Sequence, residues 1–155
     1  MNPHRPTPRR LLLLLAGLCL LAAPGLALRA STPPPVTPEK TYTLDTCVTV
    51  FDPAKLFKNG PGQAFWFADE HLTPDHRTVK LSIMPPRSAS HPPHFHPEDE
   101  FFLVLEGTAE FFLNGQTRVV KAMASLYAPS NVPHGIRNVG DTELRYLVIK
   151  QQLPK

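Results

Sequence analysis

Hydrophobic and polar residues alternate along much of the chain after residue 40, a pattern typical of β-strands with one buried face. The clearest case is residues 77–84, where Val79, Leu81 and Ile83 alternate with polar side chains. Stretches rich in β-branched and aromatic residues, bounded by turn residues, predict further strands. These lie in residues 41–51, 63–69, 125–129 and 143–151, with two more in residues 99–122. No segment shows sustained helical periodicity, so the sequence predicts an all-β barrel or sandwich of about nine short strands.

Two turn signals divide the predicted strands. Asn114-Gly115 is expected to close a hairpin within residues 99–122, because both residues accept the backbone conformation of a two-residue turn. Residues 59–62, NGPG, are expected to separate the first two strands. The core is expected to include three consecutive aromatic residues of the second strand, Phe65, Trp66 and Phe67, with the lining of the interior or a subunit interface as the alternative.

The first 27 residues are predicted to be a signal peptide. A basic stretch ending in Arg9-Arg10 precedes an apolar run from Leu11 to Ala23. This run is shorter than the ~20 residues that a membrane span requires, so no stable anchor is expected after cleavage. Cleavage is expected after Ala27, or as late as residue 30. The predicted location is therefore the periplasm or the exterior, by the general secretory or the twin-arginine route.

Residues 31–40 contain four prolines and are predicted to form an extended linker before a single domain over residues 41–155. The net charge of +3 does not indicate a nucleic-acid partner. Four of the sixteen basic residues fall in the first 30 residues, where no acidic residue occurs. The rest of the chain carries twelve basic and thirteen acidic residues, so its charge is nearly balanced.

Only one of the two cysteines, Cys47, lies beyond the predicted leader, so the mature chain has no second cysteine for an intramolecular disulfide. Cys47 falls within the first predicted strand and is expected to be a small buried hydrophobic residue. A reactive thiol or an intermolecular bridge is the alternative in an oxidising compartment.

Two histidines and an acidic residue share one face of the chain if residues 94–104 are extended. His94, His96 and Glu100 have the same parity, and so do Phe102 and Val104. One face then presents two imidazoles and a carboxylate, followed by apolar residues. Imidazole suits Mn, Fe, Ni, Cu and Zn, and the carboxylate offsets part of the charge of the ion in an apolar interior. The sequence therefore predicts a divalent transition-metal site whose ion it does not identify.

At these residues the sequence resembles the cupin superfamily. Residues 94–107, HFHPEDEFFLVLEG, match the first cupin motif at His94, His96, Glu100 and Gly107. Residues 128–138, APSNVPHGIRN, match the second motif at Pro129, His134 and Asn138. The resemblance covers residues 63–150 and implies a double-stranded β-helix, or jelly-roll, barrel. It also implies that one metal is held by His94, His96, Glu100 and His134.

The second motif departs from the family pattern at its turns. Met123 and Ala124 stand where the motif usually begins with a glycine, often followed by an aspartate. Asn131 replaces a further glycine, and asparagine tolerates the left-handed backbone conformation better than most residues. These positions bear no ligand, so the departures concern the loop before His134 and leave the predicted metal site intact.

The other candidate residues have structural interpretations. His91 is expected to lie in the loop beside the site, with replacement of a ligand as the alternative. His71 and His76 are expected on the surface of a polar loop. Glu98 shares the parity of Glu100, but the motif spacing selects Glu100. Asn138 is expected to close backbone hydrogen bonds at a turn.

Two classes of function follow from the resemblance. The first is a metal-dependent enzyme acting on a small oxygenated molecule, with a quercetin-dioxygenase-like oxidation as its specific form and Glu100 as the base. The second is a non-catalytic periplasmic protein that binds a metal or a small ligand. Assembly as a homodimer is implied for both.

Overall fold

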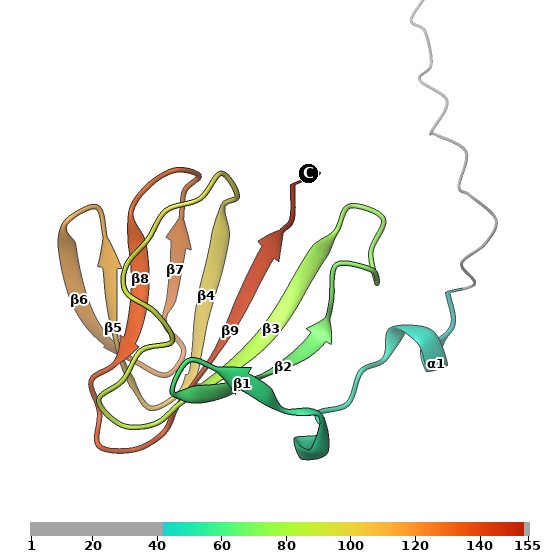
Figure 1. The fold of residues 1–155 in the computed structure, drawn as a ribbon, viewed down its shortest axis with the longest axis horizontal. Helices are drawn as coiled ribbons and strands as arrows, with labels where there is room; N and C mark the ends of the chain where they lie inside the picture. Colours follow the sequence, from blue (N-terminus) through green and yellow to red (C-terminus); the bar gives the residue numbers. More distant parts are fainter. Residues whose placement is uncertain (1–41, 154–155) are drawn as a thin grey trace, which may run out of the picture. The chain divides into compact units, whose positions relative to one another are not determined.

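A computed structural model describes residues 42–153. The predicted signal peptide, residues 1–27, and the predicted linker, residues 31–40, lie outside the described residues. The described part contains nine strands and two short helical segments, so its fold is almost entirely β (Figure 1). Among residues 42–153, no helix has the length and apolar composition needed to cross a membrane.

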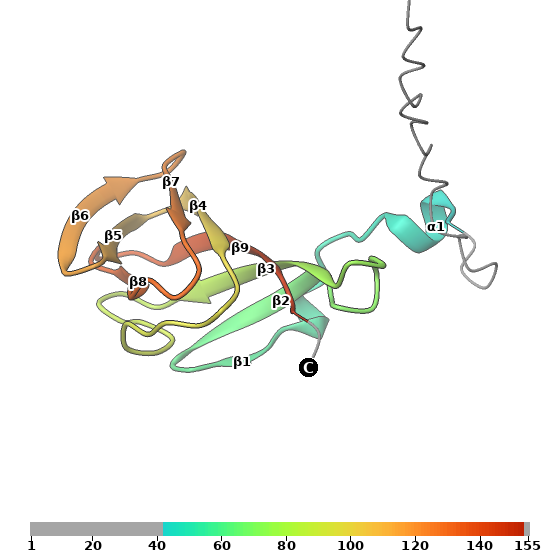
Figure 2. The same ribbon diagram turned by 90° about the horizontal axis from the view of Figure 1, so that it is seen from above.

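The strands form two antiparallel sheets that follow the jelly-roll pattern expected from the sequence. The larger sheet contains, in spatial order, β1 (Phe57–Asn59), β2 (Gly62–Ala68), β3 (Arg77–Met84), β9 (Leu144–Gln151), β4 (Glu100–Glu106) and β7 (Ser125–Ala128). The smaller sheet contains β6 (Gln116–Lys121), β5 (Thr108–Leu113) and β8 (His134–Asn138). The smaller sheet lies beside β4 and β7, whereas β2 and β3 lie beyond β9 (Figure 2).

The main core contains inward-facing residues of both sheets. Phe102 and Val104 of β4 contribute from the larger sheet, and Phe111 of β5 contributes from the smaller one. Tyr146 of β9 is 2% exposed and is one of the largest side chains buried there. Burying a large apolar side chain of this kind contributes about 2 kcal/mol, so these residues stabilise the closure of the two sheets.

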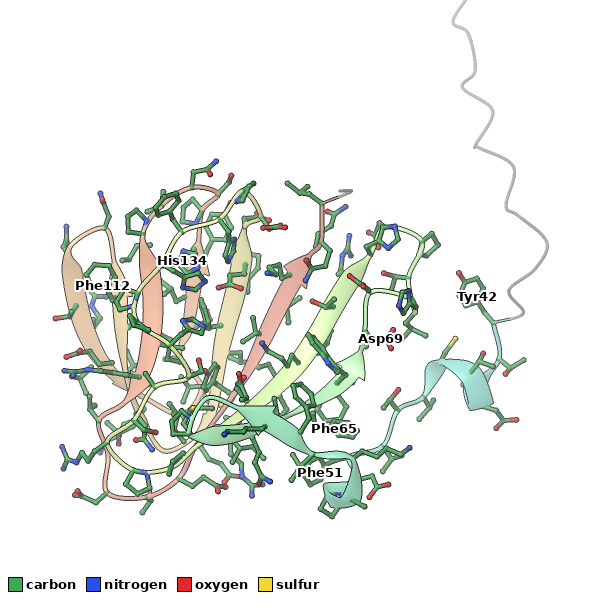
Figure 3. The ribbon with its side chains drawn as sticks, in the orientation of Figure 1. Tyr42, Phe51, Phe65, Asp69, Phe112 and His134 are labelled. Atoms are coloured by element: carbon green, nitrogen blue, oxygen red, sulfur yellow. The ribbon has the colours of Figure 1, made fainter. Side chains whose placement is uncertain are left out.

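A second apolar cluster covers the opposite face of β2 and β3. It contains Phe65, Leu81 and Ile83, with Phe51 packed against them. The rings of Phe51 and Phe65 meet edge to face, with centroids 5.3 Å apart (Figure 3). The predicted alternation of apolar and polar residues in β3 is therefore confirmed. The polar face of this strand is buried as well, because Ser82 is only 1% exposed and points into the barrel.

The strand predicted over residues 41–51 is wrong. Residues Leu44–Cys47 form a short helix, α1, which Thr43 and Thr46 cap reciprocally at its N-terminus. Residues 42–50 are all exposed and have no neighbouring strand to pack against. Their high β-propensity therefore does not make them a strand. Cys47 is consequently exposed and not buried as expected.

The aromatic run in β2 divides between core and surface. Phe65 is buried and Phe67 is partly buried, as expected for core residues. Trp66 is 38% exposed, so the expectation that it belongs to the core is wrong. The difference follows from the alternation of side chains along a strand, which turns Trp66 to the face opposite Phe65.

The segment 99–122 contains three strands where two were predicted. Asn114 and Gly115 have positive φ values of 47° and 81° and close the expected hairpin between β5 and β6. A further break falls at Gly107, where the chain leaves the larger sheet and enters the smaller one. Gly107 has φ +89°, and a Cβ atom there would lie 2.6 Å from the Glu143 carbonyl oxygen.

We therefore expect Gly107→Ala to lower the free energy of unfolding by about 3 kcal/mol, because it adds backbone strain and a clash with rigid backbone. Gly115→Ala is the matched control. Gly115 also has positive φ, but nothing lies within 4 Å of the added methyl group. It should cost only about 1 kcal/mol, the penalty for the backbone conformation alone. Urea denaturation of both variants tests this difference, and equal losses would contradict it.

Candidate metal centre

Three segments bring the four predicted ligands together. Glu100 is the first residue of β4 and His134 is the first residue of β8. His94 forms an isolated bridge with His134, and His96 lies in the loop that follows. The candidate ligand atoms of the four residues all lie within 4.8 Å of one another. The structure thus places together the side chains that the two motifs indicated.

The assumption of a continuous strand over residues 94–100 is wrong, because residues 95–99 contain no strand. Backbone bonds to the second motif align the histidines instead. The amide of each residue in the His94–His134 pair donates to the carbonyl of the other, at 3.0 and 2.9 Å. The Asn131 amide donates to the His96 carbonyl at 2.8 Å. Asn131 has φ 58°, the left-handed conformation expected for this replacement of glycine.

Three imidazole rings surround the carboxylate of Glu100. Their centroids are 5.1 Å apart for His94–His96 and 4.8 Å apart for the two pairs that include His134. Glu100 Oε1 lies 2.9 Å from His134 Nε2 and 3.7 Å from His96 Nε2. The side chains of His134 and Glu100 are 0% and 6% exposed, so these donor atoms are removed from water.

Backbone carbonyls orient two of the imidazoles. His96 Nδ1 lies 2.8 Å from the Glu98 carbonyl oxygen, and His134 Nδ1 lies 2.7 Å from that of Val132. A carbonyl can only accept, so each Nδ1 carries the proton and each Nε2 keeps its lone pair. This is the tautomer that metal-ligating histidines usually have. Glu98 Oε2 lies 3.3 Å from His96 Nδ1 and adds to this orientation, a role that the sequence did not reveal.

Unsatisfied polar atoms at the cluster test whether a metal fits. His94 Nδ1 and His134 Nε2 are buried and have no hydrogen-bond partner within the described residues. His134 Nε2 is close to Glu100 Oε1, but not in hydrogen-bond geometry. A buried nitrogen without a partner is costly unless something binds it. Three imidazoles and one carboxylate match the ligands that divalent transition metals prefer, so the cluster can hold such an ion.

Burial lowers the pKa of His94 from 6.5 to about 4, and the neighbouring His91, His134, His96 and Lys150 add to the shift. His94 is therefore neutral at pH 7, as a metal ligand must be. Between pH 6.5 and pH 4 the unfolded chain binds a proton at this residue that the folded chain does not.

The metal-free protein should therefore lose stability as the pH falls through this window, whereas above pH 6.5 this residue should contribute no pH dependence. His94→Asn should lose less stability over the same window. Thermal unfolding of both proteins at pH 7, 6, 5 and 4.5, in chelator, measures this. Identical pH profiles for the two proteins would contradict the burial of a neutral imidazole.

The three other histidines within residues 42–153 do not join the cluster. His91 is exposed, and its Nδ1 lies 3.0 Å from the carbonyl of Pro92, although its ring lies 4.3 Å from the ring of His94. His71 and His76 are exposed, as expected. Met123, at a family glycine position, has φ 66° and is 82% exposed, so the turn keeps its shape without glycine.

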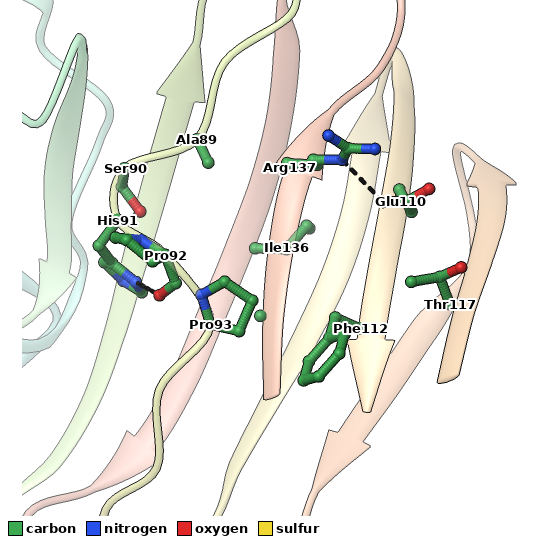
Figure 4. Close-up of a pocket in the computed structure, with 11 residues that line it drawn as sticks. Ala89, Ser90, His91, Pro92, Pro93, Glu110, Phe112, Thr117, Ile136 and Arg137 are labelled. Carbon is green, nitrogen blue, oxygen red and sulfur yellow. Dashed lines mark hydrogen bonds and ion pairs between the residues drawn. The ribbon is translucent and has the colours of Figure 1, made fainter. Parts of the chain in front are cut away.

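A cavity of about 570 Å³ lies outside the barrel, between residues 89–93 and the outer face of β5 and β8 (Figure 4). Phe112 lies on its wall, together with an ion pair in which Arg137 Nε is 2.7 Å from Glu110 Oε1. None of the four clustered residues lines it. We assign the functional site to the cluster, because the cavity holds no comparable set of convergent metal-binding groups.

Two curated proteins share sequence with this chain. H2HPP isomerase of Bacillus subtilis is 40% identical over 74 residues, which are 47% of this chain and 31% of that protein. Polyketide synthase CurC of Streptomyces cyaneus is 43% identical over 53 residues, 34% of each chain. The matched parts thus span about a third of the length of these relatives.

The family comparison and the solved structures agree with the fold. The cupin domain profile matches residues 80–150. A cupin 2 conserved barrel domain protein from Salinispora arenicola superposes with a TM-score of 0.58 at 20% identity, covering 68% of this chain and 87% of that chain. At this identity the likeness concerns the fold alone. The profile match spans both motifs, so residues 80–150 of this chain form a cupin domain, and the shared barrel agrees with that fold.

Proposed function

We propose that this chain is an exported, metal-dependent enzyme acting on a small oxygenated organic molecule. The observation that carries the proposal is the convergence of His94, His96, Glu100 and His134, with buried nitrogens that lack hydrogen-bond partners. These four residues would hold one divalent ion, of Mn, Fe, Ni, Cu or Zn. Such an ion supplies Lewis-acid chemistry, because it polarises a carbonyl or enol oxygen of the substrate.

Protein groups provide the rest of the proposed chemistry. Glu100 is the proposed base, since its carboxylate is buried at the centre of the cluster and can accept a proton from a substrate placed there. Phe102 is buried next to the cluster, with its ring 6.1 Å from that of His134, so an apolar side chain borders the proposed metal site. One relative is named an isomerase, so isomerisation of a small organic molecule is one form of the proposed activity. The dioxygenase-like oxidation expected from the sequence would use the same ligands.

Export and assembly are further parts of the proposal. Export rests on the sequence of residues 1–27. A homodimer is supported by the outer face of the larger sheet, where Phe101 and Tyr127 are 49% and 47% exposed with ring centroids 4.9 Å apart. An exposed apolar sheet face of this kind favours a protein contact. Light scattering of the mature protein measures the assembly directly.

Turnover by the metal-loaded protein tests the enzyme proposal. Separate samples are loaded with each of the five metals and incubated in deuterated buffer with α-keto acids, enols and flavonols. Nuclear magnetic resonance detects exchange at carbon beside a carbonyl, and an oxygen electrode detects oxidation. We expect exchange or oxidation that Glu100→Gln loses. A metal-loaded protein that turns over nothing in a broad panel would favour a non-catalytic binding protein.

A further inference from the structure

Two lysines share the inner face of the larger sheet with the metal cluster. The strand register pairs Glu100 of β4 with Lys150 of β9, and Lys150 with Thr78 of β3. Lys80 follows Thr78 by two residues, so its side chain points to the same face. The two ammonium groups are therefore carried on the face onto which Glu100 projects.

Electrostatic interactions show that the two lysines act on the cluster and on each other. Burial lowers the pKa of Lys80, Glu100 opposes this shift and Lys150 adds to it. Both lysines are half-buried, yet within residues 42–153 neither has a carboxylate within 4.0 Å. Two close, partly desolvated cations without an ion-pair partner favour the binding of an anion.

An aromatic surface continues the same face. Trp66 of β2 pairs with Lys80 in the register, and Lys80 Nζ lies 5.4 Å from the centroid of the Trp66 ring. Phe57 stacks beside Trp66, with centroids 5.9 Å apart and an angle of 20° between the rings. Trp66 and Phe57 are 38% and 37% exposed, so part of this aromatic pair is accessible to a ligand next to Lys80.

We propose that Lys80, Lys150 and Trp66 form a subsite for a small planar organic acid. The anionic group, a carboxylate or a phosphate, would lie at the two lysines, and the flat part of the molecule would lie on Trp66. The lysines lie on β3 and β9, between β2, which carries Trp66, and β4, which carries Glu100. Lys150 is opposite Glu100 in the register, so an acid bound at the lysines would place its anionic end beside the cluster. This last step rests on the proposed function.

Trp66 is the only tryptophan of the chain, so its fluorescence reports on this face alone. Zinc-loaded protein is titrated with phenylacetate, phenyl phosphate and the neutral phenylacetamide, with excitation at a wavelength that only tryptophan absorbs. At least one acid should produce a saturable change and bind at least about tenfold more tightly than the amide. The acid that binds more tightly identifies the anionic group as carboxylate or phosphate.

Variants then test the lysines. Lys80→Gln and Lys150→Gln should each weaken binding of that acid at least about tenfold, because each removes a charged hydrogen-bond donor. Lys121→Gln, at an exposed position of β6, is the matched control and should bind as the wild type does.

Zinc content, measured on the same samples, separates this inference from the proposed function. Wild-type protein that holds zinc but binds both acids no better than the amide would overturn the subsite and leave the metal site standing. Acid binding that Lys80→Gln and Lys150→Gln leave unchanged would overturn it as well. Wild-type protein that takes up none of the five metals would refute the metal-dependent function. Lysine-dependent acid binding in that same protein would still support the subsite.

Discussion

Replacing His96 with alanine is expected to weaken binding of a divalent metal at least a hundredfold. Losing a group that merely orients a ligand costs about 10- to 100-fold in affinity, so losing a ligand should cost more. His96 Nε2 faces Glu100, while its Nδ1 is engaged by the Glu98 carbonyl. His96 lies in the loop before β4 and belongs to no strand, so the barrel should fold without its side chain. Competition against a chelating indicator dye measures the affinity.

His91→Ala is the matched control for this loss. The His91 ring contacts that of His94, but His91 lies outside the cluster. Its removal should change the affinity less than about tenfold, as expected for a neighbour of a ligand. If His91→Ala lost the metal while His96→Ala kept it, His91 would be the ligand, as the HPPHFH sequence allows.

Asn138→Asp is expected to lower the free energy of unfolding by about 3 kcal/mol. Asn138 is 1% exposed, and its Nδ2 lies 2.8–3.1 Å from the carbonyls of Met84, Pro85 and Thr142. Its Oδ1 accepts from the Gly140 amide at 2.9 Å. Aspartate has the same shape but turns a carboxylate oxygen toward three carbonyl oxygens. The variant therefore loses stability because it buries a charge and loses hydrogen bonds. The volume of the side chain hardly changes.

Urea denaturation at pH 7 measures this loss. Gln116→Glu, which makes the same amide-to-acid change at an exposed position of β6, should alter stability by less than about 0.5 kcal/mol. Equal effects of the two substitutions would show that Asn138 is not the structural residue that its contacts indicate. This role agrees with the expectation that Asn138 closes hydrogen bonds at a turn.

Local patterns in the sequence predicted much of the fold and the composition of the site. Asn114-Gly115 predicts a tight turn, and the alternation of polar and apolar residues predicts β3. Both signals could be found because each depends only on residues that are neighbours in the sequence. The spacing of His94, His96 and Glu100 and the second motif identified the cluster by resemblance. The strand expected to align these side chains is absent, however, and the bridge to His134 replaces it.

Features that depend on strand pairing could not be predicted. Residues 44–47 have strand-forming neighbours but no partner strand, so local capping by Thr43 determines their helix. The placement of Lys150 opposite Glu100 joins residues far apart in the sequence. The exposure of Trp66 depends equally on the packing of β2, whose opposite face carries the cluster around Phe65. None of these relations is visible without the register of the sheets.

Anomalous X-ray diffraction from crystals of the mature, metal-loaded protein tests the metal site most directly. We predict one ion per chain, about 2.0–2.2 Å from nitrogen atoms of His94, His96 and His134 and from a carboxylate oxygen of Glu100. An ion found only at other residues, or crystals that hold no ion after soaking in each of the five metals, would contradict the assignment of these four ligands.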